Sequence, residues 1–359
     1  MKNPQNLSSL GEFGLIDRIA ANVGNAAGVI TGIGDDAAVT ALTPGMQLLT
    51  STDMLLEGVH FRLDWHDPYR LGRKSLAVSI SDIAAMGAVP RWALLSLAIP
   101  ADCPLELLDA FTRGFLAIAA EHGVALIGGD TCASQGGLVV SVTIMAEQQP
   151  ELIVRRSGAR TGDEIWVTGT LGDAALALSI LERGFDSAQP PNLDSAQPPN
   201  AAIQKSCSLS GVEGSDFLIS RLLDPTPRTL AGRMLAESGL VSAMIDISDG
   251  LLADFGHIAE LSGVGGTLHL DALPTSGAFR AATRGLPAFP HQLALAGGED
   301  YELCFTALPG HREKIAQIMK TCGIEATPVG IVTTLSGVTV LQSDGTPYNL
   351  QTPGFNHFI

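Results

Sequence analysis

The sequence predicts a two-domain protein of the α/β or α+β class. Its 359 residues are enough for two domains, each with a core of its own. Short apolar runs alternate with stretches of helical periodicity, a pattern typical of proteins that pack helices on sheets. The apolar residues are mainly Ala, Leu, Ile and Val, and only 5% of all residues are aromatic. This composition favours helices packed on buried strands.

The predicted strands are apolar runs of strand length that lie between turn residues. In chain order they are residues 47–51, 92–99, 124–127, 138–146, 164–168, 242–247, 302–306 and 338–342. Helical spacing of apolar residues predicts helices at 13–21, 69–86, 104–122, 171–182, 249–261 and 310–321. For the helix at 104–122, we expect Asp102 to cap the start and Gly123 to end the last turn.

We expect the domain boundary at residue 148, with one domain at 1–148 and the other at 149–359. A Gln-Gln-Pro sequence at 148–150 interrupts the preceding strand pattern. Within the second domain, residues 186–192 recur at 194–200 and are rich in Pro and Gln. Residues 185–215 are therefore expected to form a low-complexity surface loop, or else a Pro-rich segment that binds a partner.

The composition excludes several classes of partner. The formal charge of −16 argues against nucleic acid and against an anionic membrane surface. The five cysteines show neither zinc-site spacing nor a disulfide framework, so we expect a reducing compartment. Neither a signal peptide nor an apolar stretch long enough to cross a bilayer is recognised, so the sequence predicts a cytoplasmic protein.

One pattern recurs six times: an apolar run, then small residues, then an acid. The acids that end these runs are Asp35 and Asp36, Asp53, Asp82, Asp130, Asp246 and Asp249, and Glu299 and Asp300. We expect most of them at the ends of buried elements, where small neighbours let a ligand approach the backbone. Asp82 is expected instead on a helix face, with Ser75 and Ser79. Acids that converge need cations, because carboxylates held close together resist joint ionisation.

Oxygen ligands of this kind suit Mg²⁺, which often bridges carboxylates to phosphates. The sequence therefore predicts a Mg²⁺-dependent site that handles phosphates. Taken singly, each acid could instead be a polar turn, a helix cap or a solvated surface charge. Arg156 could bind a phosphate or could be a surface charge in a boundary loop. The phosphate loop with Lys-Ser/Thr and the protein-kinase motifs are absent from the sequence.

The motifs together resemble the thiamine-monophosphate kinase family. The resemblance extends from Gly11 to Phe358. It is carried by the segments 32–36 (Gly-Ile-Gly-Asp-Asp), 51–53 (Ser-Thr-Asp), 77–88, 126–131, 245–250 and 297–303. It implies a fold like that of aminoimidazole ribotide synthetase, in which the sheet of the N-terminal domain pairs across a homodimer. It also implies transfer of the γ-phosphoryl of ATP to thiamine monophosphate, with several Mg²⁺ ions and without a phospho-enzyme.

The resemblance also implies a role for each matching residue. The implied metal ligands are Asp36, Ser51, Thr52, Asp53, Asp82, Asp130, Asp246 and Asp249. The implied ATP contacts are Gly129, Asp130, Arg156 and Ser248, and of these Asp130 and Arg156 would stabilise charge during transfer. The implied contacts to thiamine monophosphate are His60, Glu299 and Phe355.

Three other functions fit part of the pattern. Aminoimidazole ribotide synthetase and selenophosphate synthetase belong to the same superfamily. The latter normally has a reactive Cys or selenocysteine near its N-terminus, whereas this chain has no Cys before Asp35. A non-catalytic scaffold that binds Mg²⁺ or Ca²⁺ is the alternative from a different class.

Overall fold

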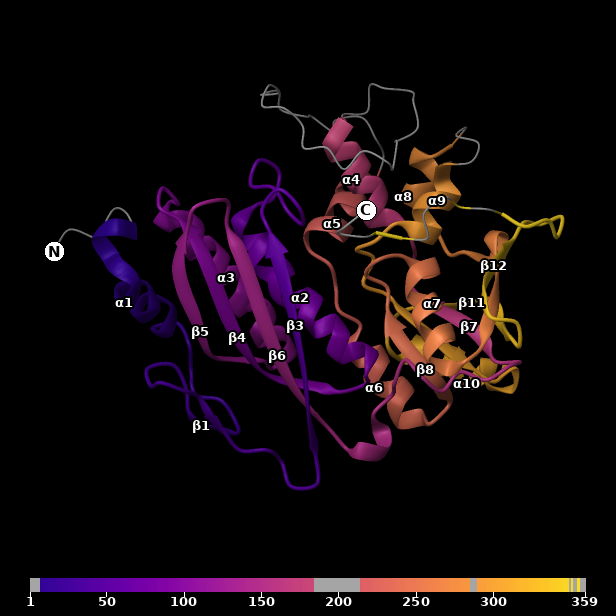
Figure 1. Cartoon of the computed structure of the whole chain (residues 1–359), viewed down its shortest axis with the longest axis horizontal. Coiled ribbons are helices and arrows are strands. Elements are labelled where there is room, and N and C mark those ends of the chain that lie inside the picture. The colour runs from indigo at the N-terminus through magenta and orange to yellow at the C-terminus, as the bar shows by residue number, and fades with distance from the viewer. Residues whose placement is uncertain (1–6, 184–213, 285–288, 349, 351–353, 356–359) are drawn as a thin grey trace. The chain divides into compact units, whose positions relative to one another are not determined.

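The computed structural model describes residues 7–183, 214–284, 289–348, 350 and 354–355 (Figure 1). The chain divides into two compact units, Met1–Ile83 with Ala88–Ile153, and Ala84–Gly87 with Val154–Ile359. The surface loop expected at 185–215 lies outside the described residues apart from its last two. None of the helices in the described ranges is long and apolar enough to cross a membrane.

The first unit is built on a four-stranded sheet with the order β3-β6-β4-β5. Its strands are β3 (Gln47–Leu56), β4 (Val89–Pro100), β5 (Ala125–Ser134) and β6 (Val139–Gln148). Strands β4 and β5 are parallel, and the other neighbours are antiparallel. A small separate ladder joins β1 (Val29–Thr31) to β2 (Val39–Thr40).

Helices α2 (Pro68–Ala85) and α3 (Leu105–His122) cover one face of this sheet, and α1 (Leu7–Ala20) precedes them (Figure 1). The two helices touch at glycines: a Cβ on Gly72 would lie 1.9 Å from the Phe111 carbonyl oxygen. Gly114 faces the Tyr69 carbonyl oxygen in the same way, at 1.8 Å. Glycine is therefore required at both positions, because any side chain would push the helices apart.

The opposite face of the sheet is exposed in the isolated chain. Successive strand residues point to opposite faces, and on β3 the side chains of Thr50, Thr52 and Met54 are exposed while Leu49 and Leu55 are buried. The exposed face thus combines apolar and hydroxyl side chains.

The second unit contains a six-stranded sheet with the order β12-β9-β11-β7-β10-β8. Only β12 and β9 run parallel among its described pairs. Its strands are β7 (Glu164–Thr168), β8 (Val241–Asp246), β9 (Gly265–His269), β10 (Leu303–Ala307), β11 (Ala326–Thr333) and β12 (Gly337–Leu341). Its helices are α4 (Asp173–Arg183), α5 (Ser215–Leu223), α6 (Thr229–Ser238), α7 (Leu251–Ser262), α8 (Gly277–Ala282), α9 (Phe289–Ala296) and α10 (Arg312–Thr321).

This sheet has a hydrophobic core on each face. On one face Phe305 and Trp166 stack with ring centroids 6.0 Å apart, in a cluster with residues of α6 and α10. On the other face Cys304 and Ile245 pack against α7 through Phe255. Strand β10 is buried along its whole length and lies between β7 and β8 in the sheet. The residues that immediately precede Leu303 are therefore attached to a fixed strand.

The structure confirms every predicted strand and helix, with shifted ends. The cap expected for α3 is wrong: the helix begins at Leu105 after Pro104, without a side-chain cap, although Gly123 ends it in the left-handed conformation as expected. Strands β1, β2, β9 and β11 and helices α5, α6, α8 and α9 were not predicted. Pro328 and Gly330 break the strand pattern of β11, and the structure has a register shift between them.

Candidate functional site

In the first unit, two candidate metal ligands lie side by side. Asp53 projects from β3 and Asp82 from α2, and a serine from the other element holds each of them. The Ser79 hydroxyl of α2 donates to Asp53 Oδ2 at 2.6 Å, and the Ser51 hydroxyl of β3 donates to Asp82 Oδ2. The expected helix face carrying Ser79 and Asp82 is thus confirmed, and it faces the strand.

The environment of Asp53 is unfavourable for a free carboxylate. Burial, followed by the charge of Asp82, raises the pKa of Asp53 to about 6, although the hydrogen bond from Ser79 opposes this shift. A cation between the two carboxylates would remove the repulsion. The donors are all oxygen atoms, which fits Mg²⁺.

These two carboxylates are not a complete metal site. Among the residues that the structure describes, no group of three or more His, Cys, Asp or Glu side chains could hold a metal ion. Mg²⁺ does not require such a group, because it commonly keeps several waters and uses one or two carboxylates together with substrate phosphates.

Thr52 and Asp130 lie on the other face of the sheet. Thr52 alternates with Asp53, and its hydroxyl donates to the Val142 carbonyl oxygen at 3.2 Å. Asp53 shares a register row with Val142, Leu95 and Gly129, whereas Asp130 shares the next row with Ser96 and Ser141. Asp53 and Asp130 also sit on the two edge strands. The sheet of one chain therefore does not bring them together.

The expectation that these acids end their elements is wrong for both. Strand β3 continues to Leu56 and β5 continues to Ser134. Gly129 also has a packing role, because a Cβ there would lie 1.8 Å from the Leu95 carbonyl oxygen. The need for glycine at this position is therefore explained without a phosphate.

The remaining candidates of the first unit lie in turns. Asp36 is exposed, and its backbone N–H donates to Asp35 Oδ1 at 2.9 Å. His60 Nδ1 accepts from the Leu56 N–H at 3.0 Å, which fixes the imidazole over the turn that follows β3.

In the second unit, the segments 246–250 and 297–302 run together, and we call them the acidic loop pair. The Glu299 N–H donates to the Ser248 carbonyl oxygen at 2.7 Å, and the Tyr301 N–H donates to that of Ile247 at 2.8 Å. The Phe355 N–H donates to the Asp249 carbonyl oxygen at 3.1 Å. Backbone hydrogen bonds thus bring Ser248, Asp249, Glu299 and Phe355 into one place.

A buried acid holds the first of these loops. Oδ2 of Asp254 accepts hydrogen bonds from the backbone N–H groups of Ser248, Asp249 and Gly250 at 3.0–3.1 Å. Burial, together with the charge of Asp249, raises the pKa of Asp254 to about 7. Asp246 is 4% exposed at the end of β8, while Arg156 is exposed in the loop before β7.

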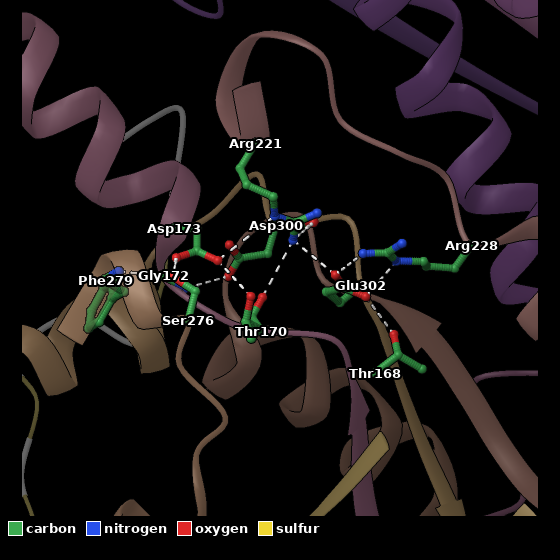
Figure 2. Close-up of polar contacts among 10 residues, drawn as sticks. All are labelled: Thr168, Thr170, Gly172, Asp173, Arg221, Arg228, Ser276, Phe279, Asp300 and Glu302. Carbon is green, nitrogen blue, oxygen red and sulfur yellow. Dashed lines mark hydrogen bonds and ion pairs between the residues drawn. The ribbon is translucent and has the colours of Figure 1, made fainter. Parts of the chain in front are cut away.

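A buried cluster of ionic side chains holds the second loop (Figure 2). Arg221 Nη2 donates to Glu302 Oε1 at 2.9 Å, and Arg228 Nε donates to Glu302 Oε2 at 2.7 Å. The Glu302 side chain is fully buried. Oδ2 of Asp300, also buried, accepts from the Gly172 N–H at 2.8 Å.

The sequence analysis did not identify Asp254, Arg221 or Arg228. Asp300 and Glu302 alternate along the chain with Glu299 and Tyr301. This alternation was the available signal that the side chains of Asp300 and Glu302 point into the protein. The sequence carried no comparable signal for the two arginines, because they lie 81 and 74 positions from Glu302.

Both units of the chain match known protein families. Residues 34–147 match the family model for the N-terminal domain of AIR synthase related proteins, and residues 160–341 match that for the C-terminal domain. The thiamine-monophosphate kinase of Salmonella typhimurium is 38% identical over 350 residues, which cover 97% of this chain and 98% of that protein.

Solved structures of thiamine-monophosphate kinases are similar to this chain over most of its length. A thiamine-monophosphate kinase from Stenotrophomonas maltophilia K279a superposes with a TM-score of 0.78 and 39% identity, covering 93% of this chain and 96% of that one. AaThiL, solved in complex with AMPPCP and TMP, superposes with a TM-score of 0.71 and 30% identity, covering 99% and 100%.

Proposed function

The chain belongs to the thiamine-monophosphate kinase family, and on that premise we propose how its residues convert thiamine monophosphate and ATP to thiamine diphosphate and ADP. An oxygen of the acceptor phosphate forms a bond to the γ-phosphorus of ATP, and the bond from that phosphorus to the bridging oxygen of ADP breaks. A phosphate monoester has a second pKa of about 6, so the acceptor is largely ionised near neutral pH and needs no general base. The main obstacle is repulsion between two anions.

We propose that Asp53 and Asp82 form the centre of the Mg²⁺ site. The other proposed ligands are Asp36, Ser51, Asp246 and Asp249. Thr52 and Asp130 are also proposed as metal ligands, but they lie on the sheet face opposite Asp53, so within one chain they would hold a different ion from the Asp53–Asp82 pair. Bound Mg²⁺ supplies the positive charge that offsets the repulsion between the phosphates. Gly129, Asp130, Arg156 and Ser248 are assigned to ATP. The guanidinium of Arg156 stabilises the negative charge of the phosphoryl group in transfer directly, whereas Asp130 would do so through the Mg²⁺ that it would hold.

On the acceptor side, we propose Glu299 as the main contact to thiamine. The thiazolium ring carries a positive charge, and a carboxylate beside it is electrostatically favourable. Phe355 supplies an aromatic face, which can stack on a cationic ring, and His60 completes the set. The hydrogen bonds of Glu299 and Phe355 to residues 248 and 249 support placing these two residues together.

We further propose that the protein works as a homodimer in which the sheets of the first unit pair. The exposed sheet face offers Met54, which is 57% exposed, and both edges of the sheet carry site candidates. If β3 of one copy pairs with β5 of another, the strand carrying Asp130 comes to lie beside the strand carrying Asp53. Mixing inactive Asp53→Ala and Asp130→Ala proteins then restores about a quarter of wild-type turnover, because one site in each mixed dimer is intact. If both residues act from one chain, mixing restores nothing.

We propose a reducing, cytoplasmic location. In the described part of the chain Cys103, Cys132, Cys304 and Cys322 are free thiols. Proteins of oxidising compartments more often pair their cysteines.

The Asp53–Asp82 pair is the observation that carries the proposal, because two carboxylates held by serines call for a cation. The test is formation of ADP and thiamine diphosphate in the presence and absence of thiamine monophosphate and Mg²⁺. We expect both products only when all components are present, and none from Asp53→Ala. ADP release that does not depend on thiamine monophosphate, or normal turnover by Asp53→Ala, would overturn the assignment.

A further inference from the structure

The loop that carries Glu299 has an unusual backbone. Glu299 has φ 70° and Tyr301 has φ 49°, and these are the non-glycine residues with positive φ in the described part of the chain. Residues with side chains rarely adopt this left-handed conformation, because it brings Cβ too close to the following carbonyl oxygen. The surrounding structure must therefore impose it.

The residues that alternate with these two are the anchors. Asp300 is 1% exposed and Glu302 is 0% exposed. Glu302 Oε2 accepts from the Thr168 hydroxyl at 2.7 Å and from Arg228, and its Oε1 accepts from Arg221 and Arg228. Figure 2 shows both guanidinium groups converging on this one carboxylate.

Arg221 also holds the main chain of the loop. Its Nη2 donates to the Asp300 carbonyl oxygen at 3.0 Å, in addition to the bond to Glu302. Its Nε lies 3.9 Å from Asp173 Oδ2, and the Asp173 side chain is fully buried. One guanidinium thus ties together the start of α4, the backbone of the loop and the start of β10.

Stability alone does not account for such a cluster. Buried ion pairs gain little over well-packed apolar residues, because desolvating the charges offsets their attraction. Their directional hydrogen bonds do fix geometry. The conformation fixed here is that of Glu299, whose N–H is hydrogen-bonded to Ser248 next to Asp249.

We propose that Arg221, Arg228 and Glu302 are positioning residues that hold Glu299 in its left-handed conformation. They thereby fix the position of thiamine monophosphate at Glu299 relative to ATP at Ser248. This inference rests on the proposed role of Glu299. The cluster acts through the loop backbone and touches neither substrate in the inferred arrangement. Loosening it lowers kcat/KM for thiamine monophosphate and leaves the KM for ATP unchanged.

Arg228→Lys is the main variant, because it keeps the charge and removes the two-pronged bond to Glu302. We expect kcat/KM for thiamine monophosphate to fall about ten- to a hundredfold, as for a reacting group that is slightly misplaced. Thr168→Val removes one hydrogen bond to Glu302 and the acceptor of the Leu303 N–H but leaves both arginines in place, and a smaller fall in the same parameter is expected. It keeps the test open if Arg228→Lys does not fold.

A double-mutant cycle with Glu299→Gln separates positioning from general stability. If Arg228 acts through Glu299, Arg228→Lys has little further effect once Glu299 is Gln. If the two effects multiply, the positioning role is overturned. The control is Arg312→Lys, since Arg312 binds Glu164, which pairs with Ala307 at the far end of β10 from Glu302. Because the Arg312 side chain is 61% exposed, this change should alter stability little and leave kcat/KM unchanged.

The wild-type protein distinguishes failure of this inference from failure of the proposed function. If it shows no turnover that depends on thiamine monophosphate, the proposed function itself is wrong. If it turns over normally and the Arg228 and Glu299 effects multiply, only the positioning role is wrong.

Discussion

Replacing Asp53 by Asn is expected to abolish turnover and, in the absence of metal, to make the protein more stable. Asn keeps the size of the side chain and still accepts the hydrogen bond from Ser79, but it removes a buried charge that faces Asp82. The pKa of Asp53 is raised from 3.8 to about 6, so ionisation costs the folded state about 3 kcal/mol at 1.36 kcal/mol per unit.

The sign follows from linkage. Because the folded pKa lies above the unfolded pKa, the cost is absent below about pH 4, where both states are protonated, and complete above about pH 6. The stabilisation of Asp53→Asn over the wild type should therefore appear between pH 4 and pH 6 and stay constant to pH 8.

The assay is thermal unfolding followed by circular dichroism, in EDTA and in Mg²⁺. We expect Asp53→Asn to unfold a few degrees above the wild type in EDTA. We expect Mg²⁺ to raise the unfolding temperature of the wild type but not that of Asp53→Asn. The matched control is Asp109→Asn. Hydrogen bonding to Arg18 lowers the pKa of Asp109, so this change should destabilise slightly and leave the Mg²⁺ response intact. If Asp53→Asn unfolds earlier in EDTA, or gains as much from Mg²⁺ as the wild type, the reasoning about the carboxylate pair is wrong.

Three further predictions concern other parts of the fold. Burial raises the pKa of Asp300 to about 8, so its folded state retains a proton that the unfolded chain loses. The wild type should lose about 1 kcal/mol per pH unit between pH 5 and 8 relative to Asp300→Asn, measured by urea unfolding, and parallel pH profiles would contradict this. Asp254→Ala leaves three backbone N–H groups without their acceptor and should cost about 3 kcal/mol; a loss below 1 kcal/mol by urea unfolding would show that the loop finds other partners. Met54→Glu on the exposed sheet face should yield a monomer in light scattering, and an unchanged dimer would exclude this face from the interface.

Local sequence signals predicted the elements of the fold well where those signals were strong. The spacing of Phe111 and Phe115 predicted α3, and Gly123 predicted its end. The cap at Asp102 failed because the chain enters the helix through Pro104, which fixes the backbone without a side-chain bond. Strand β9 was missed because it begins with Gly265 and Gly266, which carry no strand signal.

The candidate site was predicted in part. The sequence identified the acids as candidates, and their roles stay predictions, while the helix face of Ser79 and Asp82 is confirmed. The sequence did not show that Thr52 and Asp130 lie on the sheet face opposite Asp53. The predicted strands ended before these residues, and only the pairing with neighbouring strands shows that β3 and β5 continue through them. Asp130 could not be assigned to a face until the register with Ser96 was known.

The order of motifs along this chain, by itself, determined the family and the kind of chemistry, since each acid alone could be a turn, a cap or a surface charge, whereas six such motifs in one order match one family. The tertiary structure alone decided how the loop bearing Glu299 is held. Its supports, Arg221 and Arg228, lie more than 70 positions away from Glu302. No local pattern encodes such a pairing, because it arises only when separate elements fold around one buried carboxylate.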